Sequence, residues 1–297
     1  MNFKEITIKD KALFDRYLVP YNPQVSEFTF TNFFMWRGYY RFRYAEANGM
    51  LCIIAVPVNS EPYALMPIGR INSAGFSDTV SELKKYFRMN GWELVFKKIP
   101  EDCLPYFKDI AGEGITIEHD RDNSDYVYLT EDLVTLKGKK FHAKRNHINK
   151  FVKMYKYEYT ALDDSLVGDC IRIMEDWCRE RNCHCQKGDY CEKYANIEVL
   201  ENYRILGCKG ALIKVGGSFE AFTVGEMLNR DTAVVHIEKA SFSIDGLYSF
   251  VNQQFCENEW KHTTYINREQ DLGQEGLRKA KLSYNPVRMV EKYIVAI

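Results

Sequence analysis

The stretch 209-KGALIKVGGSFEAFTVGEML-228 decides the fold of the second half of the chain. Two apolar runs, 209–215 and 219–228, flank the dipeptide Gly216–Gly217. Glycine readily adopts the positive φ that the tight turn of a β-hairpin requires, so the stretch predicts a hairpin. The segment 232–239 follows at once and predicts a third strand of the same sheet.

Helices and strands alternate irregularly outward from this hairpin. The apolar periodicity of the second half predicts helices at 140–155, 165–181, 190–207, 246–260 and 274–282, and further strands at 263–267 and 288–295. The first half predicts strands at 39–44, 50–56, 63–68, 92–97 and 126–129, and helices at 10–17, 28–37, 77–90 and 103–111. This order predicts an α+β protein with mixed central sheets flanked by helices. The length of 297 residues suggests two domains, and the polar segment 130–139 places their boundary between 1–134 and 135–297.

The composition is that of a folded, water-soluble chain. It is 46% hydrophobic and 27% charged, which excludes a disordered chain, a collagen and a disulfide scaffold. The 40 basic and 41 acidic residues leave a net charge of −1, so any site for an anionic partner must be local. The sequence shows no apolar run of membrane-spanning length and no apolar core of a signal peptide near Lys4. We therefore expect a cytoplasmic protein with its nine cysteines reduced.

One segment is strongly basic. The residues 137-KGKKFHAKRNHINKFVK-153 include lysines, arginine and histidines but no acid. On a helix, Lys140, Lys144 and His147 share a face. With Arg145, these side chains suit the phosphates of a donor molecule. The alternative, which composition slightly favours, is the solvated face of an amphipathic helix.

A second block, 236-HIEKASFSIDG-246, passes from a strand into a helix. Strand alternation places His236 and Glu238 on one side, where they could act as acid and base. Backbone N–H groups near Gly246, at the start of the helix, would attract an anion or a developing oxyanion. The alternative is a charged rim on an antiparallel sheet.

A third block, 265-YINREQDLGQEGLRKAKLSYNP-286, follows a strand directly. Strand ends that lead into loops often carry functional residues. We expect Asp271 and Glu238 to do the acid–base work, with His236 as the alternative, and Asn267 to hold an oxyanion. Four further residues of this block are expected to line the substrate cleft: Glu269, Arg278, Lys281 and Tyr284. The alternative is a capped loop in which Gly273 prepares the following helix.

A cysteine cluster invites comparison with zinc sites. It consists of Cys178, Cys183, His184, Cys185 and Cys191. The spacing lacks a paired C-x-x-C, so we predict ordinary thiols, and a zinc site is the less favoured alternative. The chain also lacks a P-loop, a nucleophile elbow, an H-E-x-x-H and an EF-hand loop.

Several of these runs carry a family resemblance. The runs KKFHAKRNHINKF (139–151), VHIEKA (235–240) and YINREQDLGQEGLRKAKLSYNPV (265–287) resemble an uncharacterised bacterial family related to the C-terminal domain of phosphatidylglycerol lysyltransferases. The runs FTFTNFFMWRGYY (28–40) and PYALMPIG (62–69) resemble it as well. The resemblance implies two tandem GNAT-like acyltransferase domains, as in Fem-type peptidyltransferases. Those enzymes move an aminoacyl group from a charged tRNA to an amine or hydroxyl acceptor.

The chain departs from the GNAT pattern at one loop. The position of the GNAT pyrophosphate loop, 240–247, holds one glycine, Gly246, and no Q/R-x-x-G-x-G/A motif. This favours aminoacyl-tRNA over acyl-CoA as donor. The membrane domain that the lysyltransferases carry has no counterpart in this sequence, which argues against a lipid acceptor. The acceptors that we consider are a small molecule, a peptide or a lipid headgroup. Two alternatives stay open: a non-catalytic GNAT-fold sensor, and an acyl-CoA-dependent N-acetyltransferase.

Overall fold

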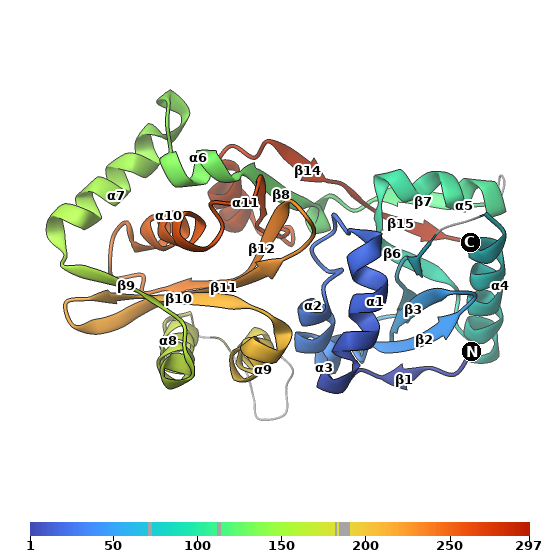
Figure 1. The fold of residues 1–297 in the computed structure, drawn as a ribbon. Helices are drawn as coiled ribbons and strands as arrows, with labels where there is room; N and C mark the ends of the chain where they lie inside the picture. Colours follow the sequence, from blue (N-terminus) through green and yellow to red (C-terminus); the bar gives the residue numbers. More distant parts are fainter. Residues whose placement is uncertain (71–72, 112–113, 182, 184–190) are drawn as a thin grey trace. The chain divides into compact units, whose positions relative to one another are not determined.

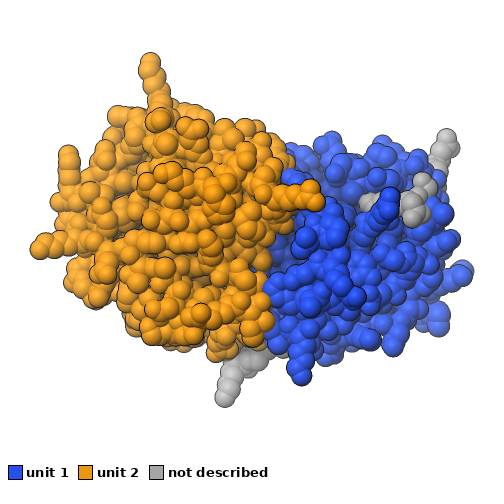
Figure 2. All heavy atoms as spheres, in the orientation of Figure 1, with its two compact units in different colours: residues 1–125, 270–273, 289–297 blue, residues 126–269, 274–288 orange. Residues whose placement is uncertain are grey.

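The computed structural model describes residues 1–70, 73–111, 114–181, 183 and 191–297. The chain forms two compact units, which Figure 2 colours separately. Unit 1 comprises Met1–Asp125, Gln270–Gly273 and Met289–Ile297, and unit 2 comprises Tyr126–Glu269 and Gln274–Arg288. The compact units change at 125/126, and the end of the chain returns to unit 1. The predicted domain boundary at 134/135 stays a prediction.

The described part of unit 1 contains an eight-stranded sheet in the order β1-β2-β3-β4-β6-β15-β7, with β5 paired to β3 (Figure 1). Its strands are β1 (Lys4–Glu5), β2 (Arg43–Ala47), β3 (Met50–Ala55), β4 (Tyr63–Ala64), β5 (Ile68–Gly69), β6 (Val95–Pro100), β7 (Thr116–His119) and β15 (Lys292–Ala296). Its helices are α1 (Lys11–Tyr21), α2 (Phe30–Met35), α3 (Arg37–Tyr40), α4 (Ser73–Met89) and α5 (Leu104–Ala111). Every residue of β3 is buried, as its continuous apolar sequence indicates.

The last strand, β15, carries a buried lysine into the core of unit 1. β15 lies between β6 and β7 and is antiparallel to both. The ammonium of Lys292 is fully buried and forms ion pairs with Asp125 at 2.6 Å and Glu27 at 2.5 Å. Burial opposes the charge of Lys292, but the two carboxylates outweigh it and raise its pKa. A lone buried ammonium would be very unfavourable, so this pairing is required for β15 to enter the core.

Unit 2 is built on the predicted hairpin. The order of its sheet is β14-β8-β13-β12-β11-β10-β9. Its strands are β8 (Asp125–Leu129), β9 (Tyr157–Ala161), β10 (Lys209–Val215), β11 (Ser218–Met227), β12 (Thr232–Ala240), β13 (Tyr265–Asn267) and β14 (Arg288–Val290). Val215 pairs with Ser218 across the turn, and Gly216 and Gly217 have φ of 58° and 102°. The hairpin prediction is therefore confirmed.

Helices cover both faces of this sheet. They are α6 (Thr130–Thr135), α7 (His142–Met154), α8 (Val167–Glu180), α9 (Glu192–Leu206), α10 (Leu247–Glu259) and α11 (Glu275–Leu282). α10 packs on β10, β11 and β12 and against α6 and α7, while α8 packs on β11 and β12 and against α9 (Figure 1). The α+β prediction with mixed, helix-flanked sheets is confirmed.

Among the described residues, no helix has both the length and the apolar character needed to cross a membrane.

Candidate functional site

The candidate site lies where two neighbouring strands of unit 2 separate. β12 pairs with β13 in parallel only over Thr232–Val234. After β13 the chain turns, and Glu269 adopts a φ of 58°. Between β13 and this turn, Arg268 reaches across to β12, where its Nη2 donates to Glu238 Oε1 at 2.9 Å. Both side chains keep 14% exposure, so the pair lies at the edge of the core.

Three further side chains surround this pair. The Nδ2 of Asn252, on α10, donates to Glu238 Oε2 at 3.1 Å. The guanidinium carbon of Arg268 lies 4.8 Å from the ring centroid of Tyr284, and Lys144 Nζ of α7 lies 3.9 Å from the same centroid. We call these five residues the Arg268 cluster: Lys144, Glu238, Asn252, Arg268 and Tyr284.

The Arg268 cluster has more positive than negative charge. Lys144 and Arg268 face one carboxylate, that of Glu238. Burial and the charge of Arg268 lower the pKa of Lys144 to about 8, and Glu238 opposes this shift only in part. Burial disfavours the charge of Arg268, but Glu238 outweighs burial and raises its pKa. Lys144 can therefore exchange a proton near neutral pH while Arg268 stays charged.

Two buried atoms of the Arg268 cluster lack a hydrogen-bond partner among the described residues. They are Arg268 Nη1, a donor, and Asn252 Oδ1, an acceptor. Most buried polar atoms are paired, so such exceptions indicate strain, a functional role or a bound molecule. The sequence predictions included Glu238, Lys144 and Tyr284 but missed these two residues. Arg268 lies within the third polar block, whereas the only signal for Asn252 is a polar residue on the buried face of a helix.

The predicted residues next to Arg268 fix its backbone. Glu269 N donates to Asn267 Oδ1 at 2.8 Å. The ammonium of Lys281 donates to the carbonyl oxygens of Arg268 and Glu269. The amide of Tyr126 also donates to the Glu269 carbonyl, at 3.2 Å. These bonds hold the turn with its positive φ, and thereby the direction in which Arg268 points.

His236 lies between two carboxylates. Its side chain is fully buried, with Nε2 2.9 Å from Glu226 Oε1 and Nδ1 2.8 Å from Glu269 Oε1. Burial alone would lower the pKa of His236, but the hydrogen bonds to Glu226 and Glu269 raise it to about 10. The imidazole is thus protonated at neutral pH and has no lone pair with which to act as a base.

The prediction that His236 and Glu238 share one strand face is wrong. The pairing of β12 with β11 skips His236, since Val235 pairs with Gly225 and Ile237 with Val224. The extra residue forms a β-bulge, which breaks the alternation of side chains. A Cβ on Gly225 would face Phe255 of α10, so the side chain of the next residue, Glu226, lies on the opposite face of the sheet. His236 bonds Glu226 and therefore lies on that opposite face as well. Glu238 instead faces α10.

Asp271 belongs to unit 1 and is fully buried. Its Oδ1 accepts from Gly273 N at 2.9 Å, and its Oδ2 lies 3.4 Å from Arg121 Nη1. These contacts are those of the capped loop that the sequence offered as an alternative. The catalytic role of Asp271 stays a prediction.

Two residues of the basic segment have local partners. Lys140 Nζ lies 2.8 Å from Asp132 Oδ2. The guanidinium of Arg145 donates to the carbonyl oxygens of Leu136 and Gly138, which closes the turn before α7. Both contacts help to define where α7 begins.

The start of α10 packs tightly on α7. Gly246 has a φ of 84°, and a Cβ there would lie 2.4 Å from the carbonyl oxygen of His147 and 3.0 Å from Phe151 Cβ. The imidazole of His147 lies 3.3 Å from Asp245 Oδ1. Gly246 thus has a packing reason for being glycine, whatever it binds. Arg278 lies half-buried on α11.

The cysteine cluster is only partly described. Cys178 and Cys183 are free thiols, whereas His184 and Cys185 lie outside the described residues. Cys191 is disulfide-bonded, so the expectation of nine reduced cysteines is wrong at this position. Among the described residues, no group of three or more His, Cys, Asp or Glu side chains could hold a metal.

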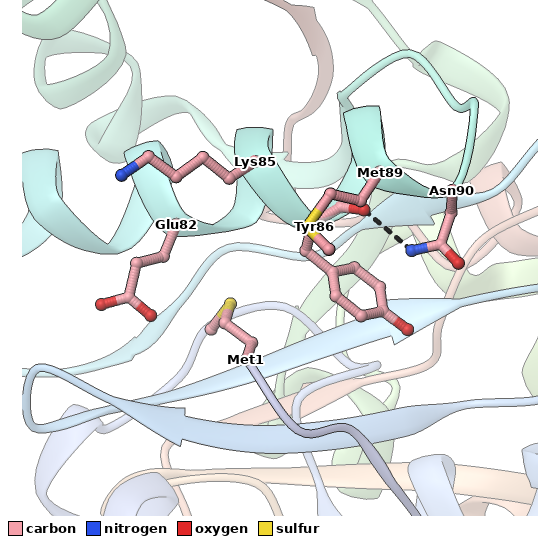
Figure 3. A pocket seen from close by; sticks show the side chains of 6 residues that line it. All are labelled: Met1, Glu82, Lys85, Tyr86, Met89 and Asn90. Atoms are coloured by element: carbon pink, nitrogen blue, oxygen red, sulfur yellow. Dashed lines mark hydrogen bonds between the residues drawn. The ribbon is translucent and has the colours of Figure 1, made fainter.

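Unit 1 has a surface hollow between the N-terminus and the end of α4. It is lined by Met1, Glu82, Lys85, Tyr86, Met89 and Asn90 (Figure 3). Asn90 Nδ2 donates to the Tyr86 carbonyl at 2.8 Å and is thereby satisfied.

Comparisons with known proteins find structures that match this chain over nearly its whole length. A conserved protein of unknown function from Bacteroides thetaiotaomicron is 35% identical, with coverage of 100% of this chain and 99% of that one and a TM-score of 0.93. The structure of L-PGS from Bacillus licheniformis is 15% identical, with coverage of 99% and 92% and a TM-score of 0.69. FemX is 10% identical, with coverage of 100% and 97% and a TM-score of 0.60.

These neighbours confirm the fold expected from the resemblance, that of tandem GNAT-like and Fem-type proteins. An uncharacterized protein of Mycoplasmoides gallisepticum is 21% identical over 206 residues, and the match spans 65% of that protein's length. The family model described as phosphatidylglycerol lysyltransferase, C-terminal, matches residues 19–296. The chain belongs to the phosphatidylglycerol lysyltransferase C-terminal family.

Proposed function

We propose that the chain transfers an aminoacyl group from an aminoacyl-tRNA ester to a nucleophilic acceptor at the Arg268 cluster. The carrying observation is that a permanently charged guanidinium and a lysine that titrates near neutral pH lie against the same ring, that of Tyr284. Arg268 has an unpartnered Nη1 among the described residues, and the pKa of nearby Lys144 is lowered to about 8. Acyl transfer requires these two functions, an oxyanion donor and a base.

The proposed reaction is a single acyl exchange. The acceptor hydroxyl or amine attacks the ester carbonyl and gives its proton to neutral Lys144. Arg268 Nη1 donates to the oxyanion that forms on the carbonyl oxygen. The bond from the carbonyl carbon to the ribose oxygen then breaks, and the ribose oxygen takes the proton from the Lys144 ammonium, which returns Lys144 to its neutral form. Glu238 binds Arg268 Nη2 at 2.9 Å and keeps the guanidinium oriented.

Two observations support the choice of donor and acceptor. The loop at 240–247 lacks the glycine motif that binds pyrophosphate in GNAT enzymes, which favours tRNA over acyl-CoA as donor. The name of the family specifies phosphatidylglycerol, which supports a lipid headgroup as acceptor. Small molecules and peptides remain the alternative acceptors that the experiment compares.

The test is transfer of radiolabelled amino acids from bulk charged tRNA to phosphatidylglycerol vesicles, peptides and polyamines. The variants are Lys144→Met and its matched control Lys153→Met, an exposed lysine of the same helix. Removal of a general base typically lowers the rate by about 10²–10⁴-fold, so we expect that loss for Lys144→Met alone. Absence of transfer to every acceptor contradicts the proposal. So does equal activity of the two variants.

A further inference from the structure

The two oxygens of Glu238 determine how Asn252 is oriented. Oε1 accepts from Arg268 Nη2 at 2.9 Å and Oε2 accepts from Asn252 Nδ2 at 3.1 Å. The opposite orientation of the amide would set its oxygen against a carboxylate, so the hydrogen-bond network assigns Nδ2 to Glu238. Asn252 Oδ1 therefore points away from Glu238.

This arrangement leaves a complementary pair of buried atoms beside one carboxylate. Arg268 Nη1 is a donor and Asn252 Oδ1 is an acceptor, and neither has a partner in the described part of the chain. Asn252 is 1% exposed, so bulk water does not readily satisfy its oxygen. Because an unpaired buried polar group destabilises a protein, a matching ligand would be bound strongly at these two atoms.

The chemistry of the two atoms defines the ligand. Arg268 Nη1 needs an acceptor, such as an ester carbonyl oxygen. Asn252 Oδ1 needs a donor such as the N–H of an amino group, since its own amide nitrogen is already bonded to Glu238. A group with a carbonyl oxygen and an ammonium on adjacent carbons meets both needs, whereas a plain acyl group supplies only the carbonyl.

We propose that Asn252 is a specificity-determining residue, which accepts a hydrogen bond from the α-ammonium of the aminoacyl group while Arg268 Nη1 binds its carbonyl oxygen. This inference rests on the proposed function, since it assigns the donor of that reaction. It predicts rejection of acyl esters without an α-amino group. A site built to hydrogen-bond an N–H group rejects analogues that lack it, because its own buried atom is then left unpaired.

The test uses non-hydrolysable probes and the full chain. The probes are 3′-alanylamino- and 3′-lysylamino-3′-deoxyadenosine, each compared with the analogue in which hydrogen replaces the α-amino group. Binding is measured by calorimetry for the wild type, Asn252→Leu and a matched control, Asn258→Leu. Asn258 is an exposed asparagine on the same helix.

The expected result is a preference for the α-amino probes of at least tenfold in the wild type and in Asn258→Leu. In Asn252→Leu this ratio falls to within twofold of unity, while the affinity for the des-amino probes stays unchanged. A purely structural role would lower both affinities in parallel and leave the ratio intact, which overturns the inference. Equal affinities in the wild type overturn it without any variant.

The transfer assay separates this inference from the proposed function. Transfer from charged tRNA without a preference for α-amino probes refutes the role of Asn252 alone. Transfer without binding of any probe refutes it as well. Absence of both transfer and probe binding refutes the proposed function, and the role of Asn252 falls with it.

Discussion

Replacement of Gly246 by alanine tests whether the close packing of α10 on α7 is structural. The substitution adds a Cβ at a φ of 84°, where it would lie 2.4 Å from the His147 carbonyl oxygen and 3.0 Å from Phe151 Cβ. The left-handed backbone destabilises alanine by about 1–2 kcal/mol. Overpacking typically adds about 1–3 kcal/mol, because the obstacle is the backbone of α7 and cannot rotate away.

Gly207→Ala is the matched control. Gly207 follows α9 with a φ of 80°, but a Cβ there would enter open space. The control should lose only the backbone contribution, about 1–2 kcal/mol. The difference between the two variants therefore isolates the contact of α10 with α7.

Urea unfolding of both variants, analysed by linear extrapolation, measures this difference. We expect Gly246→Ala to be less stable than Gly207→Ala by about 1–3 kcal/mol, with unchanged m-values. Equal free energies of unfolding, within about 0.5 kcal/mol, would refute the packing argument. Gly246 would then be explained better by its predicted role in anion binding.

Three further substitutions and modifications test the electrostatics. The pKa of His236 is raised from 6.5 to about 10, so its stabilising contribution is complete below pH 6.5 and is lost as the pH rises through about 10. The stability advantage of wild type over His236→Gln should therefore shrink by about 1.4 kcal/mol per pH unit in urea titrations between about pH 7 and pH 9. Lys292→Met removes the ammonium shared by two buried carboxylates, of which Glu27 keeps Lys98 at 3.0 Å, and should lower the free energy of unfolding by about 3–5 kcal/mol. Exposed Lys9→Met should change it by less than about 0.5 kcal/mol. Competitive acetylation followed by mass spectrometry should show Lys144 reacting with a midpoint near pH 8, because burial and Arg268 lower its pKa; a midpoint above pH 10 would contradict the assigned environment.

The sequence predicts best the elements whose signals are local. The Gly216–Gly217 hairpin and the helix that ends before Gly91 depend on turn glycines and apolar periodicity within a few residues, and both form. The strand expected at 288–295 is two strands, β14 and β15. β15 pairs with β6 and β7, which precede it by more than 170 residues, and no local pattern encodes that return to unit 1.

The strand-face error at His236 has a specific cause. The alternation rule assigns each side chain of a strand to one face of the sheet, counting from a single reference residue. One inserted residue therefore reverses the face assigned to every residue beyond it. The bulge in β12 depends on pairing with β11 and is not encoded by the residues of β12 alone. Glu238 bonds Arg268 and Asn252, which the sequence did not single out, and its acid–base role stays a prediction.

The polar block at 265–286 combines two kinds of residue that composition cannot separate. A side chain that acts on a ligand must be held still, so the turn that carries Arg268 needs polar neighbours to satisfy its backbone groups. Asn267 and Lys281 supply those bonds, to Glu269 N and to the carbonyl oxygens of Arg268 and Glu269. Residues that bind and residues that position are therefore equally polar and equally close in sequence. What distinguishes them is the hydrogen-bond partner of each polar atom. Lys281 Nζ donates to backbone carbonyl oxygens, whereas Arg268 Nη1 is buried with no partner in the described structure. A ligand that accepts a hydrogen bond from Arg268 Nη1 would therefore gain binding free energy there.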